Sequence, residues 1–294
     1  DHDAWVTDHS WNVDTYAQMF PFPRSAEGGP RWYARTIGDV YLVSLFVTAI
    51  WRPAAATGKG KFQEPAEALG DPNGWGYGQF VFEPVSRGSR QYDWLERQLR
   101  SAEARAARYR VVMYHHPAHG LGDNSAPAYT DPVQAVTIDP VTGGTTAVNY
   151  SYRLADDHIL RDVEPLFNAA GVNLVHNGHS HLWNRFRNAA GVNWLETSNV
   201  GNSYGAFDDS SGATRNLPDV PDHVLRGDPG RLVPQVPTIA PLTNAAGTPL
   251  PYLSSNDITV FSVLDSAAGT VRSYRFDTRL PGSSAELFDE FPLG

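Results

Sequence analysis

The feature that most constrains this chain is the stretch Gly171–Arg185, in which an apolar run ends at the sequence Gly178-His-Ser-His. Side chains two residues apart point the same way only on an extended backbone, so His179 and His181 can converge on one small volume at a strand end. On a helix they would lie about 200° apart around the axis. Gly178 permits the sharp turn that such a site needs. Because imidazole suits zinc, iron, copper or nickel, the spacing is typical of a metal site.

A single H-x-H motif also occurs by chance in solvated loops, so a second cluster of histidines bears on the interpretation. The segment Arg110–Pro117 is again a short apolar strand that ends in histidine, at His115 and His116. The proline stops the strand from continuing, and amphipathic periodicity from Tyr92 to Ala107 predicts a helix before it. Two strand-end clusters in one chain favour a metal site over two solvated loops.

The two clusters together resemble the calcineurin-like metallophosphoesterases, and within them the purple acid phosphatase branch. The resemblance rests on G-H-S-H followed by an aromatic residue, a polar residue and Arg185, on V-V-M-Y-H-H-P upstream, and on the helix sequence Gln91–Leu99. It implies an α/β (α+β) fold, a β-sandwich of two mixed sheets flanked by helices. We expect residues 1–294 to form a single domain, the C-terminal part of that catalytic domain, with residues 208–257 as a loop-rich insertion.

The resemblance also implies which residues bind metal. His115, His179 and Asp1 are expected to bind one ion, and His181 the other. His2 stands where the family has the histidine that contacts the phosphate and protonates the leaving group. Asp1 replaces the family's asparagine, and it can bind a metal but adds a negative charge. The alternative for residues 1–3 is a frayed terminus.

Further residues are expected around these ligands. His116 and Arg185 are expected behind the ligands as their support, with a place in the core as the alternative for His116. His119 and Asn124 follow in a loop and are expected to contact substrate. A plain surface histidine and a turn-forming asparagine are the alternatives for these two residues.

The chain begins inside the family's G-N-H-[DE] motif, and the D-x-H and G-D motifs that precede it have no counterpart in this sequence. We therefore expect a second polypeptide, released from one precursor by proteolytic cleavage, that carries these motifs. It would supply the leading β-α-β units of one sheet, whose absence would leave strand edges and apolar faces uncovered. The alternative is a self-sufficient domain of altered architecture.

Composition narrows the class of function. The net charge of −9 argues against a protein that coats nucleic acid, but metal ions can dominate a local field, so a small anionic substrate remains open. The absence of cysteine leaves nitrogen and oxygen ligands for any metal. No apolar run approaches the roughly 20 residues of a membrane span.

Together with these observations, the resemblance implies a hydrolase that uses a dinuclear centre of iron, zinc or manganese to cleave phosphate monoesters or diesters. We expect an extracellular or periplasmic protein. The alternative is a non-catalytic binding or scaffold subunit that has kept the histidines on a degenerate fold.

Local patterns predict the remaining elements from turn residues and periodicity. By residue range they are a hairpin over 31–47 with Gly38 and Asp39 as its turn, an irregular loop over 51–90, a long loop over 120–152, a helix over 155–167 kinked or ended by Pro165, a strand over 193–198, and a closing hairpin over 258–264 and 270–276.

Overall fold

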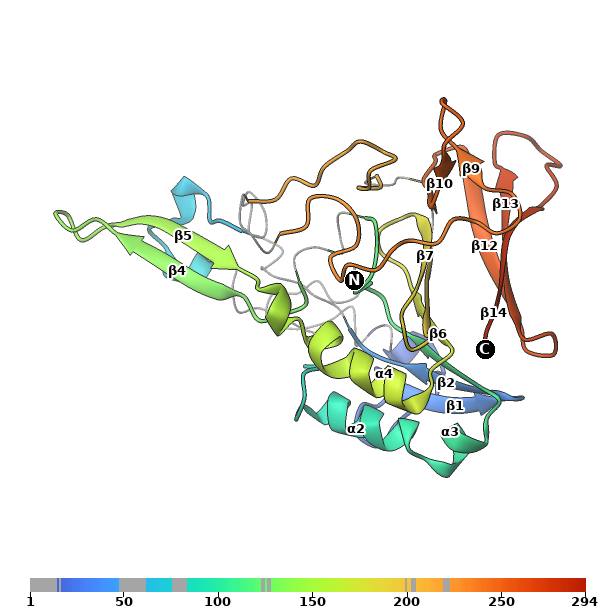
Figure 1. Cartoon of the computed structure of the whole chain (residues 1–294). Helices are drawn as coiled ribbons and strands as arrows, with labels where there is room; N and C mark the ends of the chain where they lie inside the picture. The colour runs from blue at the N-terminus through green and yellow to red at the C-terminus, as the bar shows by residue number, and fades with distance from the viewer. Residues whose placement is uncertain are drawn as a thin grey trace.

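A mixed sheet of seven strands lies at the centre of the molecule, in the order β1-β2-β3-β6-β8-β7-β11 (Figure 1). This computed structural model describes residues 15, 17–47, 62–75, 84–122, 125, 128–198, 200–201, 205–218 and 223–294. The strands of the sheet are β1 (Tyr33–Ile37), β2 (Val40–Ser44), β3 (Tyr109–Met113), β6 (Leu174–Asn177), β7 (Trp183–Arg187), β8 (Asn193–Thr197) and β11 (Tyr252–Leu253). Strands β2, β3, β6 and β8 run parallel, and antiparallel strands complete both edges.

The first hairpin is the one predicted from the sequence. Gly38 takes a φ of +59° between β1 and β2, a conformation that glycine adopts without steric strain. Asp39 occupies the same turn, and its carbonyl accepts the N–H of Tyr109 at 3.1 Å. The turn therefore aligns the start of β2 with the start of β3, and the expectation of a turn aspartate is confirmed.

Helices α2 (Arg90–Leu99), α3 (Ala102–Ala106) and α4 (Glu164–Ala170) cover one face of this sheet (Figure 1). The single helix expected over 92–107 is divided into two, because Ser101 caps the second helix by accepting the N–H of Ala104 at 3.0 Å. Trp94, Leu95 and Leu99 of α2 point into the core, as the amphipathic pattern predicted.

The helix expected over 155–167 begins in an unusual way. A 3₁₀ turn, η5 (Leu154–Asp156), and a π-helical turn, η6 (Ile159–Val163), precede α4. Pro165 lies in the first turn of α4 instead of ending a helix, since proline needs no hydrogen-bond acceptor there.

An antiparallel sheet of β12 (Ile258–Asp265), β13 (Thr270–Asp277) and β14 (Glu286–Pro292) covers the other face of the central sheet. Val260, Val271 and Phe288 from this sheet share a core with Trp183 and Leu195 from the central sheet. The α/β class with a mixed sheet and the closing hairpin is thus confirmed. The second sheet, which we expected to be mixed, is antiparallel within the described residues. Its strand β14 was not predicted from the sequence.

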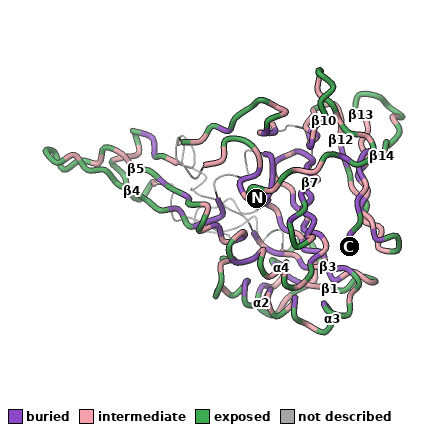
Figure 2. The backbone as a smooth tube through the Cα atoms, in the orientation of Figure 1, coloured by how far each residue is buried: buried purple, intermediate pink, exposed green. Residues whose placement is uncertain are grey.

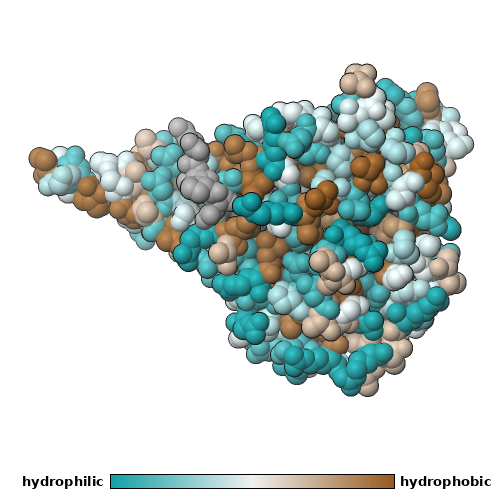
Figure 3. All heavy atoms as spheres, viewed as in Figure 1, coloured by the Kyte–Doolittle hydropathy of each residue, from teal (hydrophilic) through white to brown (hydrophobic). Residues whose placement is uncertain are grey.

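The loop expected over 120–152 contains a long hairpin, β4 (Val133–Ile138) and β5 (Thr145–Ser151), so that expectation is wrong for this part. The hairpin projects from the body as an arm (Figure 1), and Figure 2 shows that it is mostly exposed. Figure 3 shows hydrophobic side chains along it. The arm's exposed large apolar residues are Val133, Val136, Ile138 and Val141.

The remaining short elements lie in irregular segments. They are the 3₁₀ turns η2 (Ala66–Ala68) and η3 (Pro72–Gly74) and the two-residue strands β9 (Leu242–Thr243) and β10 (Pro249–Leu250). No helix among the described residues is both long enough and apolar enough to cross a membrane.

Candidate metal centre

The two histidine motifs meet because their strands are neighbours. Strands β3 and β6 are parallel and Met113 is paired with His176, so their carboxyl ends lie at the same edge of the sheet. His115 follows the end of β3 by two residues, and His179 follows the end of β6 by two residues. The N–H of Gly178 donates to the carbonyl of His115 at 3.0 Å, which ties the two strand ends together.

Three imidazoles converge at this edge. Among the described residues, His115, His116 and His179 form a group whose ligand atoms all lie within 4.8 Å of one another. The Nε2 atom of His115 and the Nδ1 atom of His179 are 3.0 Å apart. The rings of His116 and His179 have centroids 3.7 Å apart and are tilted by 41°. His116, expected behind the ligands, therefore offers a nitrogen of its own to the group.

The donor set fits a transition metal. Two imidazole nitrogens on a tetrahedral zinc ion, at about 2.05 Å from it, are about 3.3 Å apart, close to the 3.0 Å between His115 and His179. In the absence of a metal, the same contact is a hydrogen bond that needs one donor and one acceptor nitrogen. The ring that accepts this hydrogen bond is then the neutral imidazole, which is the form that binds metal.

The backbone between β6 and β7 is strained at both histidines of the G-H-S-H motif. His179 has a φ of 81° and His181 a φ of 55°, whereas Arg231 is the remaining described non-glycine residue with a positive φ. Such conformations cost of order 1–3 kcal/mol and persist where the surroundings hold them, often at functional sites. The expected extended backbone across these residues is wrong, and His181 lies outside the group of three.

A buried carboxyl lies beside the strained turn. Glu196 at the end of β8 is 2% exposed, and it accepts the N–H of Ser180 at 2.7 Å and Nδ2 of Asn184 at 2.9 Å. Burial raises the pKa of Glu196 to about 8, although these two hydrogen bonds act to lower it. Sequence reasoning missed this residue, and the signal was an acidic residue directly after the apolar pair Trp194-Leu195 in the predicted strand.

His119 is placed differently from the exposed rim position expected for it. Its side chain is 1% exposed, with Nδ1 2.6 Å from Oδ2 of Asp228 and Nε2 3.4 Å from Oε2 of Glu164. Burial alone would lower the pKa of His119, but Asp228 and then Glu164 raise the pKa to about 9. His119 is thus a buried cation that joins the 208–257 segment to the core, and substrate contact by it stays a prediction.

Arg185, another expected site residue, does not join the cluster. Arg185 on β7 forms a buried ion pair with Asp289 on β14 at 2.9 Å, so its side chain joins the two sheets. Asp1, His2 and Asn124 lie outside the described residues.

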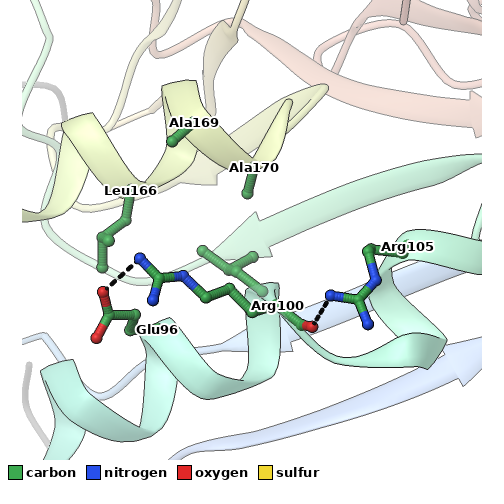
Figure 4. Close-up of a pocket in the computed structure, with 7 residues that line it drawn as sticks. Glu96, Arg100, Arg105, Leu166, Ala169 and Ala170 are labelled. Atoms are coloured by element: carbon green, nitrogen blue, oxygen red, sulfur yellow. Dashed lines mark hydrogen bonds and ion pairs between the residues drawn. The ribbon is translucent and has the colours of Figure 1, made fainter.

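A hollow of about 210 Å³ lies between α4 and the α2–α3 pair (Figure 4), away from the histidines. The C-terminal ends of these helices lead into the amino ends of β3 and β6, so the hollow is at the opposite edge of the sheet from the cluster. Glu96 and Arg100 pair across its wall at 2.8 Å. Its lining residues are Glu96, Leu99, Arg100, Arg105, Leu166, Ala169 and Ala170.

Comparison with known proteins finds similarity to solved structures only. No protein-family model matches the chain, and no curated protein matches it. The purple acid phosphatase PPD1 from yellow lupin (Lupinus luteus) seeds is 12% identical with a TM-score of 0.40, covering 94% of this chain and 34% of that one. PhoD is 13% identical with a TM-score of 0.45, covering 96% and 46%.

A third structure, GAP50, "the anchor in the inner membrane complex of Plasmodium", is 10% identical with a TM-score of 0.30, covering 87% of this chain and 49% of that one. The chain therefore spans less than half the length of each of these structures. Identities and TM-scores this low record partial structural similarity and assign no function.

Proposed function

We propose that this protein hydrolyses phosphate esters at a metal centre built on His115, His116 and His179. The observation that carries the proposal is the convergence of three imidazoles at the adjacent carboxyl ends of β3 and β6. Ligands in open α/β sheets bind outside the carboxyl ends of the strands, which is where these residues lie. The H-H-P and G-H-S-H motifs support the same reaction class by their resemblance to the metallophosphoesterases.

In this proposal the histidines hold the metal in a fixed frame. His115 and His179 bind through nitrogens that already face each other, and His116 supplies a third nitrogen or supports His179 by ring contact. When bound, the metal activates water and neutralises charge on the phosphoryl group. His181 would serve a second ion, and His2 would contact the phosphoryl oxygens or protonate the leaving group.

The three neutral imidazoles supply no negative charge, although two metal ions bring a charge of at least four. Carboxylates are therefore needed to balance the ions. We propose that Asp1 and a second polypeptide with the D-x-H and G-D motifs supply them, in a secreted or periplasmic heterodimer. Iron, zinc and manganese all suit such nitrogen and oxygen ligands.

A binding or scaffold role is the competing proposal. Its support is the tight ring contact of His116 with His179, whose other contact is the hydrogen bond to His115. Imidazoles packed in this way can also complete a core without any metal. Metal content and hydrolysis separate the two proposals, since a degenerate module needs neither.

The experiment uses the protein purified from its native source. Elemental analysis measures its metal content, and p-nitrophenyl phosphate and bis(p-nitrophenyl) phosphate measure its hydrolysis of phosphate monoesters and diesters. We expect bound Fe, Zn or Mn near two ions per assembled protein, loss of hydrolysis after chelation, and recovery when metal is restored. His115→Ala and His179→Ala should each lower hydrolysis by at least about 10²-fold and lower metal content. His158→Ala, at the N-cap of η6 and outside the cluster, is the matched control. Folded native protein without metal or hydrolysis would overturn the proposal.

A further inference from the structure

The turn that presents His179 is itself unfavourable. The N–H of Ser180 reaches the carbonyl of Gly178 at 3.1 Å across His179, whose φ is 81°. An i to i+2 hydrogen bond around a residue with positive φ is a γ-turn of the rare, strained kind. Histidine has no intrinsic preference for this conformation, so neighbouring groups must hold it.

Glu196 is the group placed to hold this turn. Its Oε1 atom accepts the N–H of Ser180 at 2.7 Å, shorter than the 3.1 Å bond within the turn. Its Oε2 atom accepts a hydrogen bond from Nδ2 of Asn184, the second residue of β7. The carboxyl group therefore binds the last residue of the turn and the start of β7 at the same time, from a strand that is paired in the central sheet.

Asn184, which donates to Glu196, also contacts the loop that follows His115 and His116. Oδ1 of Asn184 accepts the N–H of Leu121 at 2.9 Å. A Cβ atom on Gly122 would lie only 2.3 Å from Cβ of Ser180, so the two loops are in direct contact there. A chain of hydrogen bonds thus runs from the Ser180 amide through Glu196 and Asn184 to the loop after β3.

We infer that Glu196 is a positioning residue for the histidine centre, which holds His179 in its ligand orientation through the Ser180 amide and sets its distance to His115 through Asn184. This inference rests on the proposed metal function. Groups that orient metal ligands without touching the metal typically contribute 10- to 100-fold in metal affinity.

The test measures Co²⁺ binding by visible absorption and Ser180 amide hydrogen exchange in metal-free protein. In Glu196→Ala we expect Co²⁺ affinity to fall about 10- to 100-fold. We also expect Ser180 exchange to accelerate at least about tenfold, while the Trp194 amide on β8 keeps its protection. Asp289→Asn is the matched control, because it alters a buried carboxylate of the inter-sheet core and should leave both readouts unchanged.

A complementary pair of variants keeps the inference testable if Glu196→Ala does not fold. Glu196→Gln retains an acceptor for Ser180 but turns an NH₂ group toward Nδ2 of Asn184, so affinity should fall. Adding Asn184→Asp restores an acceptor opposite that NH₂ group and still accepts from Leu121. The double variant should therefore regain most of the lost Co²⁺ affinity.

The outcomes distinguish this inference from the proposed function. Tight Co²⁺ binding that survives Glu196→Ala, or no recovery in the double variant, overturns the positioning role and leaves the metal centre standing. If the wild-type protein binds no metal, the proposed function is wrong. The rate of Ser180 amide hydrogen exchange in Glu196→Ala then decides whether Glu196 holds the turn.

Discussion

The stretches that follow the two histidine motifs both contain the turn-forming residues Pro, Gly and Asp, yet they are built in opposite ways. Residues 133–151 form the arm, in which every residue of β4 is exposed (Figure 2). The described residues of 205–232 form almost no regular structure and still include Asp208, Arg215 and Asp228, at 6%, 2% and 3% exposure. The more regular stretch is thus the one that lies outside.

The difference lies in how each stretch satisfies its backbone. In the arm, strand pairing from Val133 with Ser151 onward provides regular hydrogen bonds along its length. At its base, β5 also forms backbone hydrogen bonds with Phe62 and Glu64 of the body. The described part of the irregular stretch forms no strand. Its buried carbonyl and N–H groups are satisfied by scattered backbone partners and by side chains. Arg215 donates to the carbonyls of Gly120, Gly122, Val224 and Gly227. Irregular backbone can be buried here because charged side chains complete its hydrogen bonds.

The largest expected effect is at Arg215. Arg215→Met removes four hydrogen bonds to carbonyls of two segments, and Ser125 still donates only to those of Gly120 and Gly122. Each buried carbonyl that loses its donor costs about 1–3 kcal/mol. We expect the free energy of unfolding to fall by about 4 kcal/mol, measured by urea denaturation. Arg226→Met, at an exposed position of the same stretch, should change it by less than about 0.5 kcal/mol. Equal effects would refute the contrast with the arm.

The second effect depends on pH and concerns Asp228. The pKa of His119 is raised from 6.5 to about 9 in the folded protein. The stabilisation of the folded state by protonated His119 is therefore fully present below pH 6.5 and is lost as pH rises through 9. Asp228→Asn should destabilise the protein by up to about 3 kcal/mol at pH 6, and the difference from wild type should shrink toward pH 9.5.

Unfolding free energies of both proteins at pH 6 and pH 9.5 provide this measurement. Comparing the variant with wild type removes the separate contribution of Glu196, whose raised pKa also lowers stability as pH rises above 4.5. Asp209→Asn, an exposed acid of the same stretch, should show no pH-dependent difference. A gap that stays constant with pH would show that His119 gains no protonation from Asp228.

A smaller effect is expected where the arm joins the body. Tyr150 donates to Oε1 of Glu64 at 2.7 Å in a buried contact. Tyr150→Phe removes this bond and should cost about 1–2 kcal/mol, with faster proteolysis within residues 62–75. Thr137→Val, at an exposed position on the neighbouring strand, should alter neither quantity. An unchanged stability in Tyr150→Phe would show that this side-chain hydrogen bond adds nothing to the backbone bonds between β5 and Phe62 and Glu64.

The smallest effect is expected at the arm's tip. Replacing residues 138–146 with Asn-Gly joins the paired Thr137 and Ala147 by a two-residue turn that suits hairpins. The deleted tip includes the exposed Ile138 and Val141, so we expect stability to change by less than about 0.5 kcal/mol. Thermal denaturation and metal content are the measurements. A loss above 2 kcal/mol would show that the tip supports the body.

Sequence patterns served well where the structure depends on near neighbours. The Gly38-Asp39 turn, the amphipathic face of α2 and the closing hairpin rest on local turn chemistry and periodicity. The arm was missed because its alternating strand Val133–Ile138 is embedded among turn-forming residues. The division of the helix at Ser101 was missed as well, because a serine cap competes there with a continuous amphipathic pattern.

The candidate site divides in the same way. The sequence determined by itself that two apolar strands end in histidine, that no cysteine can bind a metal, and that a turn must follow Gly178. Only the tertiary structure decided that β3 and β6 are neighbours, so that His115 and His179 meet. It also decided that Glu196 lies under the turn and that Asp228 reaches His119. Spacing sets the direction of side chains along one element, whereas contacts across elements depend on strand order and register, which arise from packing of the whole chain.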